Sequence, residues 1–241
     1  MYDLDNFSLT DMTRCGIDLR RMGKDASSAE EAAVRIVKYL HQSLGIGGRD
    51  ESACALVRFY LTVPYLTLPQ ELQEFADKLV GTRDHAATMK CLTLLATAGE
   101  LPEWNSREKS AGHKALPLLS EESISRSPMI SQLIRQLGIP VAHLLGDRPD
   151  LVIDQAQHTF NVFHVPDALG SQHIPAQADF VVPFGIKSVI GFGGMLPNGE
   201  MFSIILFSKS HIPRERAQLF NTLALNAKLA IMPFDESQIF A

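Results

Sequence analysis

The chain has 241 residues, of which 46% are hydrophobic and 20% charged, so its composition is that of a globular protein and excludes a disordered one. The 22 Lys and Arg residues are outnumbered by 27 Asp and Glu residues, and the net charge of −5 argues against a dedicated nucleic-acid binder. No apolar run is long enough for a membrane span, and the acidic start is unlike a signal peptide. The three cysteines form no CxxC motif, and we expect a cytoplasmic protein that contacts neither membrane nor nucleic acid.

Two amphipathic helices are predicted in the first 45 residues. The first has an apolar stripe at spacings of three and four residues, formed by Leu9, Met12, Gly16 and Leu19. The second begins with a capping box of Ser28 and Glu31, in which each side chain accepts a hydrogen bond from a free backbone N–H. Gly45 is predicted to end this second helix.

The middle of the chain alternates predicted strands and short helices. Residues 53–63 and 91–98 are rich in β-branched and aliphatic side chains and are predicted to be strands. A helix between them is predicted to begin at Pro69 and to end at Gly81, and Ser127-Pro128 begins another that ends at Gly138. Residues 99–119 are expected to form a long irregular loop.

Three strands and a helix are predicted near the carboxyl end. Residues 158–165 form the first strand, and residues 186–196 and 201–208 flank the turn dipeptide Asn198-Gly199, which indicates a hairpin with a type I′ turn. Pro213 opens the last helix and Pro233 ends it. The elements together predict one α+β domain, with an antiparallel sheet of four or five strands and the amino- and carboxyl-terminal helices on one face.

The carboxyl-terminal pattern resembles a GAF-like domain. It consists of a strand, an Asn-Gly turn, a second strand, a polar link and a terminal helix, in the sequence IKSVIGFGGMLPNGEMFSIILFS followed by HIPRERAQLFNTLALNAKLAI. Four other segments resemble the region that precedes the output modules of bacterial multidomain sensor proteins: CLTLLATAGELPEWNSR, SAGHKALPL, PMISQLIRQLG and FNVFHVPDA. The resemblance covers residues 8–232 and treats residues 1–241 as a single domain.

The resemblance implies a sensory or regulatory domain in bacterial signal transduction. A cap of loops and helices would cover the sheet face opposite the terminal helices, and a small molecule would bind between cap and sheet. The terminal helices would carry the signal, commonly in a dimer. No phosphoacceptor-histidine helix, GGDEF motif or helix-turn-helix is found in the sequence. We therefore expect either a stand-alone sensor that acts on a partner protein or a piece of a longer sensor.

Seven residues are predicted to contact the ligand, each with a structural alternative. Trp104 in a polar loop either covers the pocket or packs onto the core, and Arg58 in a predicted strand either binds an anionic group or points to solvent. The other five are predicted from their positions: His113, Phe163, His164, Phe184 and Phe192. Haem is a possible cofactor if His113 and His164 converge, although ordinary structural roles are the alternative for both histidines.

Three further hypotheses were weighed against simpler interpretations. Cys54 and Cys91 would serve a thiol-dependent reductase on the same scaffold, but their apolar surroundings favour buried structural cysteines. The glycines of residues 191–194 do not match a dinucleotide fingerprint and instead indicate a close backbone approach or a pocket floor. The apolar stripe of the first helix, with Leu223, Ala227 and Ala230 of the last, suits a homodimer interface or a cover for the sheet. Besides the ligand-binding sensor and the reductase, a third alternative for the function is a dimerisation scaffold without a ligand pocket.

Overall fold

A six-stranded antiparallel sheet forms the centre of the structure, a computed structural model that describes residues 1–47, 51–82, 88–145 and 161–241. Its strands follow the order β5 (Ala115–Leu118), β4 (Lys90–Gly99), β3 (Cys54–Pro64), β8 (Met201–Ser208), β7 (Ser188–Met195) and β6 (Val162–Val165). The predicted strands within the described residues are confirmed, and residues 158–160 of the strand predicted at 158–165 lie outside them. A separate parallel pair joins β1 (Tyr2–Asp3) to β2 (Leu44–Gly45).

The strand that sequence analysis missed is β5. It lies within residues 99–119, which were expected to be irregular, and it pairs with β4 at one edge of the sheet. It has four residues and includes Pro117, a residue that sheets tolerate at their edges because it cannot donate a ladder hydrogen bond. A strand this short has too little alternation to be recognised, so the prediction of four or five strands was one short.

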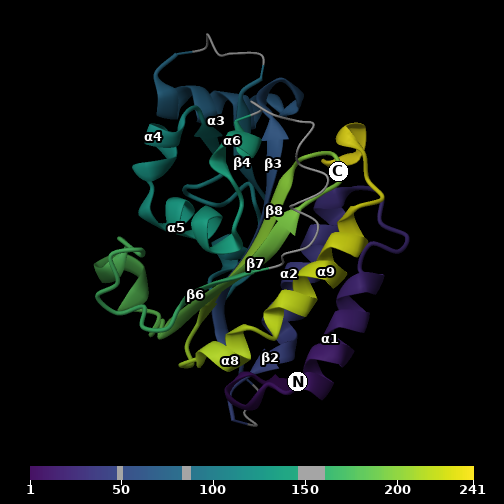
Figure 1. Cartoon of the computed structure of the whole chain (residues 1–241), viewed down its shortest axis with the longest axis vertical. Coiled ribbons are helices and arrows are strands. Elements are labelled where there is room, and N and C mark those ends of the chain that lie inside the picture. Colours follow the sequence, from purple (N-terminus) through teal and green to yellow (C-terminus); the bar gives the residue numbers. More distant parts are fainter. Residues whose placement is uncertain (48–50, 83–87, 146–160) are drawn as a thin grey trace.

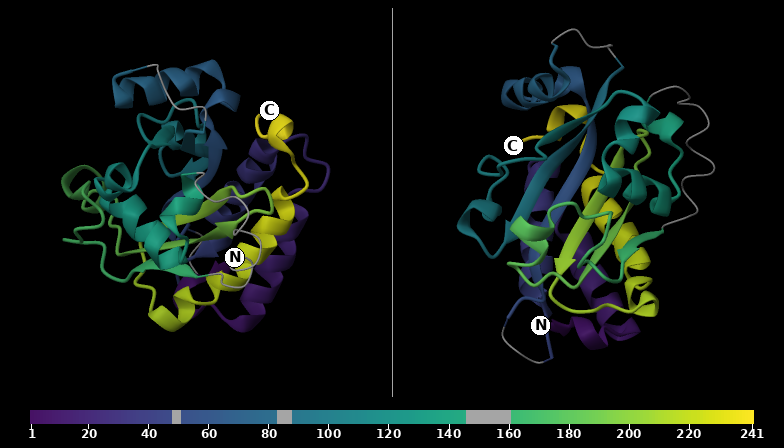
Figure 2. Two further views of the ribbon diagram at one scale, coloured as in Figure 1. Left: turned by 45° about the horizontal axis from the view of Figure 1, so that its top comes forward. Right: turned by 90° about the vertical axis from the view of Figure 1, so that its left-hand side faces the viewer.

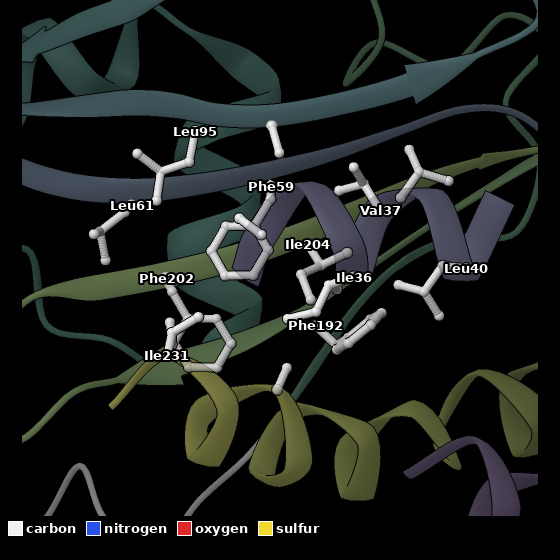
Figure 3. Close-up of a cluster of buried hydrophobic side chains, with 14 of the residues drawn as sticks. Ile36, Val37, Leu40, Phe59, Leu61, Leu95, Phe192, Phe202, Ile204 and Ile231 are labelled. Atoms are coloured by element: carbon white, nitrogen blue, oxygen red, sulfur yellow. The ribbon is translucent and has the colours of Figure 1, made fainter. Parts of the chain in front are cut away.

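Helices α2 (Ala29–Ser43) and α9 (Phe220–Ile231) cover one face of the sheet, and α1 (Leu9–Arg21) packs against α9 on the same side (Figure 1). The predicted capping of α2 is confirmed with a shift of one residue. The Ser28 hydroxyl accepts from the Glu31 N–H at 3.0 Å, whereas the Glu31 carboxylate accepts from the Ser27 N–H rather than from that of Ser28. Between these helices and the sheet lies a closed apolar core, of which Figure 3 shows Phe59, Phe192 and Phe202.

Short elements form a cap over the other face (Figure 2). They are α4 (Glu121–Ser125), α5 (Pro128–Leu137), α6 (Val141–Leu144), the 3₁₀ turn η3 (Pro102–Asn105) and the π-helical turn η5 (Gln177–Val181). Helix α5 begins at Pro128 and ends at Gly138, whose φ of 73° is left-handed, as predicted. A second apolar cluster joins α5 to this face through Leu133, Ile134 and Leu137.

The remaining elements lie at the ends of the sheet. Helix α3 (Gln70–Val80) packs beside β5 and ends at Gly81 as predicted, and α8 (Arg214–Ala217) precedes α9. The short 3₁₀ turns are η1 (Leu4–Asn6), η2 (Tyr65–Thr67) and η6 (Glu236–Gln238). Within the described residues, no helix has both the length and the apolar character that crossing a membrane requires.

The β7–β8 hairpin is confirmed, but its predicted turn type is wrong. Gly199 has a φ of 80°, whereas Asn198 is not among the described residues with positive φ, as a type I′ turn would need. The Gly199 N–H donates to the Leu196 carbonyl at 3.0 Å, and the Leu196 N–H donates to the Glu200 carbonyl at 2.7 Å. This is a three-residue loop with a glycine bulge. Pro197 favours it because the fixed φ of proline, about −65°, suits the first central position of the type I turn on which such loops are built.

The predicted dimer seam is used inside the chain. Helices α1 and α9 pack against each other, with Gly16 facing Asn226 and Gly23 facing the Ala230 carbonyl. The apolar residues assigned to that seam are mostly buried in this packing: Leu19, Leu223, Ala227 and Ala230. Leu9 is 66% exposed and Met12 is only half-buried. The stripe of α1 therefore packs against α9 within the chain, while α2 and α9 contact the sheet.

Candidate functional site

A pocket of about 310 Å³ lies between the sheet and its cap. Its floor comes from β3 and β8, and its walls come from η3, α5, the loop before β5 and residues 174–180. The lining residues are Leu56, Arg58, Tyr60, Trp104, His113, Met129, Ile174, Pro175, Ala176, Asp179, Phe180, Ile205 and Phe207. Most of them are apolar or aromatic, and a few are polar, which is the usual composition of a small-molecule site.

Arg58 is the cation of the pocket floor. It is half-buried on β3, where Thr97 of β4 and Ile205 of β8 are its direct cross-strand neighbours. Its Nη1 donates to the Tyr60 hydroxyl at 3.2 Å and its Nη2 donates to the Ser110 hydroxyl at 3.3 Å, but its buried Nε has no partner. Among the described residues, no carboxylate forms an ion pair with Arg58.

Two other buried polar atoms on the same sheet face also have no hydrogen-bond partner. They are the hydroxyl oxygens of Thr97, opposite Arg58, and of Ser203, opposite Tyr60. Both residues are buried, at 4% and 0% exposure. Most buried polar groups in proteins are hydrogen-bonded, so these two hydroxyls beside Arg58 and Tyr60 are exceptions, although neither Thr97 nor Ser203 lines the pocket.

Trp104 is held over this floor by the turn that carries it. The Asn105 side chain binds both backbone groups of Gly99, accepting from its N–H at 3.1 Å and donating to its carbonyl at 2.8 Å. This anchors η3 to the end of β4 in the way a neighbouring strand would. Gly99 is required here because a Cβ atom would lie 2.9 Å from the Trp104 ring and from the Ala55 carbonyl oxygen.

The indole of Trp104 belongs to an aromatic cluster that forms one wall. Its ring centroid lies 4.5 Å from that of Phe184 and 5.6 Å from that of Phe180. Phe180 in turn contacts Phe207 of β8 at 5.0 Å in an edge-to-face arrangement. The cluster therefore connects η3, the residue 174–184 segment and the sheet.

His113 lines the pocket from a strained backbone position. Its φ of 61° is left-handed, which is uncommon for a residue other than glycine. Contacts on both sides of it hold this conformation. The Ser110 hydroxyl donates to the Gly112 carbonyl at 2.9 Å, and the Leu94 N–H donates to the Lys114 carbonyl at 2.8 Å. Burial away from water and, to a smaller extent, the positive charge of Arg58 lower the pKa of the His113 imidazole. The imidazole is therefore neutral at neutral pH.

The structure brings three of the seven predicted ligand contacts together, Arg58, Trp104 and His113. Phe184 lies behind Trp104 and outside the lining, and Phe163 is fully buried under α5, against Leu133 and Gly191.

Two predicted contacts are remote from the pocket. Phe192 belongs to the core on the opposite face of the sheet and packs on Phe220 of α9 (Figure 3). His164 lies on the edge strand β6, where its Nε2 is 2.8 Å from the Ile212 carbonyl oxygen. The structure therefore does not bring these two residues into one pocket with His113, and strand alternation turns Phe192 to the helix-covered face. His164 and His113 do not converge on a common haem site.

Several lining residues were missed by sequence analysis. Tyr60 could have been predicted from the sequence, because residues two apart on a strand share a face and Arg58 was already a candidate. Phe180 and Asp179 come from the connection before β7, and Met129 comes from α5. No local pattern indicates that these last three lie near β3, since only the packing of the cap brings them there.

The two cysteines of the reductase hypothesis are far apart. Cys91 is opposite Val63 at one end of β3, and Cys54 lies at the other end. Val63 is nine positions after Cys54 on the strand, which is roughly 30 Å at ~3.3 Å per residue. A disulfide requires Cα atoms within about 7 Å. Burial also raises the pKa of each thiol to about 12, and both side chains belong to the helix-face core. Neither is a reactive thiolate near the pocket.

The glycines of β7 serve packing rather than the pocket. A Cβ atom on Gly193 would lie 2.1 Å from the Phe202 carbonyl oxygen, and one on Gly191 would lie 2.9 Å from the side chains of Leu133 and Phe163. The close-approach interpretation is therefore correct. Within the described part of the chain, no cluster of three or more His, Cys, Asp or Glu side chains is arranged to hold a metal ion.

Comparison with known proteins assigns the chain to no group. No model of a known protein family matches the sequence, and no curated protein matches it either.

Proposed function

We propose that the chain is a GAF-like sensory domain that binds a small molecule in the pocket over β3 and β8 and acts on a protein partner. The observation that carries this proposal is the half-buried Arg58, incompletely paired at the floor of an otherwise apolar pocket. Buried polar groups without partners are costly, and proteins retain them chiefly at functional sites. The strained His113 at the same pocket is a second feature of this kind.

A route from the pocket to the ends of the chain supports a signalling role. Arg107 follows η3 closely in sequence, and its Nε and Nη1 donate to the carboxylates of Glu30 and Glu71 at 2.8 and 2.6 Å. Its guanidinium also lies 5.6 Å from the centre of the Phe240 ring. A ligand that moves Trp104 would therefore pull on contacts shared by the pocket loop, the first turn of α2, helix α3 and the carboxyl-terminal residues.

Glu30 strengthens this connection because it also binds the end of the chain. Its carboxylate accepts from the Ala241 N–H at 3.1 Å, and its own N–H donates to the Ile239 carbonyl at 2.8 Å. Occupancy of the pocket is thus proposed to change how residues 239–241 dock on α2. A homodimer through the terminal helices would use their exposed apolar side chains, Leu9, Ile17 and Leu225, in place of the buried seam.

The proposal is tested with protein purified from its own cells, by native mass spectrometry. A bound molecule adds mass to the folded chain, an absorption spectrum identifies a haem, and the same measurement gives the oligomeric state. In the matched variants Ala176→Trp and Ala178→Trp, both alanines are exposed on the same segment but only Ala176 lines the pocket. We expect added mass in the wild type and in Ala178→Trp, and its loss in Ala176→Trp. A bare chain in all three contradicts the proposal.

A further inference from the structure

We infer that the molecule bound in this pocket is a small organic anion with an aromatic or branched apolar body, held through a carboxylate on Arg58. The inference rests on the proposed function, since it names the class of ligand for the same pocket. It is drawn from the unpaired charge of the floor, the aromatic wall and the size of the pocket.

Two half-buried arginines, Arg58 and Arg107, differ in the groups that they contact. Arg107 contacts two carboxylates, those of Glu30 and Glu71. Arg58 donates only to two hydroxyls, of Tyr60 and Ser110, and its Nε is buried without a partner. A guanidinium presents its N–H groups as a planar fork that matches a carboxylate. Because Arg58 lines the pocket, an anion bound there would supply the countercharge that Glu30 and Glu71 supply to Arg107.

The walls determine the rest of the ligand. Trp104, Phe180 and Phe207 provide aromatic surface, and Met129, Ile174 and Ile205 provide aliphatic surface around the same space. A volume of about 310 Å³ is at the small end of ligand pockets. A single ring with a short acidic side chain fits within this volume.

Asp179 is the one feature of the pocket that would attract a cation instead. It is exposed at the rim, where solvent screens its charge, whereas Arg58 is half-buried on the floor. The positive charge therefore dominates the interior. The neutral imidazole of His113 adds a hydrogen-bonding group without adding a second charge. An amine held by Asp179 is the competing occupant, and the experiment includes it.

Trp104 allows a direct test because it is the only tryptophan in the chain and lines the pocket. Its fluorescence is titrated with phenylacetate, phenylacetamide and phenethylamine, which share one apolar body and are anionic, neutral and cationic. We expect phenylacetate to bind about 10- to 100-fold more tightly than phenylacetamide, the range of a hydrogen bond to a charged group. Arg58→Gln should make the two equal, and Arg58→Lys should keep part of the preference because it retains the charge.

The control is Arg126→Gln, which removes an arginine from an exposed ion pair on the cap and should leave the preference for phenylacetate unchanged. Circular dichroism of each variant establishes that it is folded. Equal binding of phenylacetate and phenylacetamide by the wild type, or tighter binding of phenethylamine, overturns the inference but not the proposed function. No response to any probe also overturns it, and the native mass then decides the proposed function separately.

Discussion

The two faces of the sheet are built by different rules. On the helix-covered face, Phe59, Phe192 and Phe202 are fully buried, and three long helices close the core (Figure 3). On the cap-covered face, short helices and turns enclose a pocket of about 310 Å³ around Arg58. The left-handed His113 and the unpartnered hydroxyls of Thr97 and Ser203 all lie on this second face.

This difference indicates that the helix-covered face mainly stabilises the fold and that the cap-covered face is the one suited to binding. Complete apolar packing contributes most of the free energy of folding, and interiors packed in this way have little room for ligands. Exceptions to local rules occur on the helix side too, where His41 Nε2 has no partner and Asp25 has a positive φ, but most of the unpartnered buried atoms among the described residues lie on the cap side. Such exceptions are concentrated at functional sites in proteins generally. The cap face is therefore where we place function.

The largest expected effect separates the two faces by their contribution to stability. Phe202→Ala removes a fully buried ring from the helix-face core and should lower the free energy of unfolding by about 3–5 kcal/mol. Phe180→Ala, in the half-buried aromatic cluster of the cap, should cost only about 1–2 kcal/mol because part of its ring is already hydrated. Urea denaturation of both variants measures the difference, and equal losses would remove the proposed distinction.

A smaller effect is expected from the turn that positions Trp104. Asn105→Ala removes the two hydrogen bonds to Gly99 and a third to the Leu101 carbonyl, and should cost about 1–2 kcal/mol. The fluorescence of Trp104 should also shift toward that of a hydrated indole, because the ring loses its anchor. Ser106→Ala is the neighbouring control. An unchanged emission spectrum in Asn105→Ala would show that the aromatic cluster alone holds the indole.

The strain at His113 predicts an effect of about 1 kcal/mol. Glycine adopts positive φ without a steric penalty, so His113→Gly should be more stable than His113→Ala by about that amount. Both variants lack the imidazole, and only the backbone preference differs between them. Thermal or chemical unfolding measures it, and equal stability of the two variants would mean that residue 113 relaxes out of the left-handed region.

The smallest expected effect is the change in the free energy of unfolding when the pH is lowered. Burial lowers the pKa of His41, His113 and His164, and Arg58 contributes at His113, so the folded chain binds fewer protons than the unfolded chain just below the ordinary value of about 6.5. Stability should therefore be complete above pH 6.5 and fall as the pH drops through the lowered values. His113→Gln should reduce this slope in denaturation experiments. A stability that rises on mild acidification would contradict the prediction.

Regular elements were the most predictable part of this protein. The limits of α3 and α5 follow from Pro69, Gly81, Pro128 and Gly138, because proline and glycine restrict or permit particular backbone angles whatever surrounds them. The apolar stripe of α2 identified its buried side, and that of α1 did so only at Gly16 and Leu19, since Leu9 is exposed. Strand β5 was not predicted because so short a strand depends on its pairing with β4. The turn type at Asn198 was predicted wrongly because the preceding proline favours a different loop.

The candidate site was predictable only where a side chain was unusual for its local setting. Arg58 in an apolar strand and Trp104 in a polar loop were identified in this way, and both line the pocket. Phe192 was misplaced because its hydrophobicity suits either face of a strand buried on both sides. Phe180 and Met129 carry no local sign of their position.

The amino-acid sequence by itself determined the helices, most of the strands, the α+β class and two anomalous residues, because these depend on interactions between near neighbours along the chain. Only the tertiary structure decided which face of the sheet each strand residue occupies and which distant segments meet over Arg58. Those outcomes depend on how the cap and the terminal helices pack on opposite faces, and packing of that kind joins residues far apart in the chain.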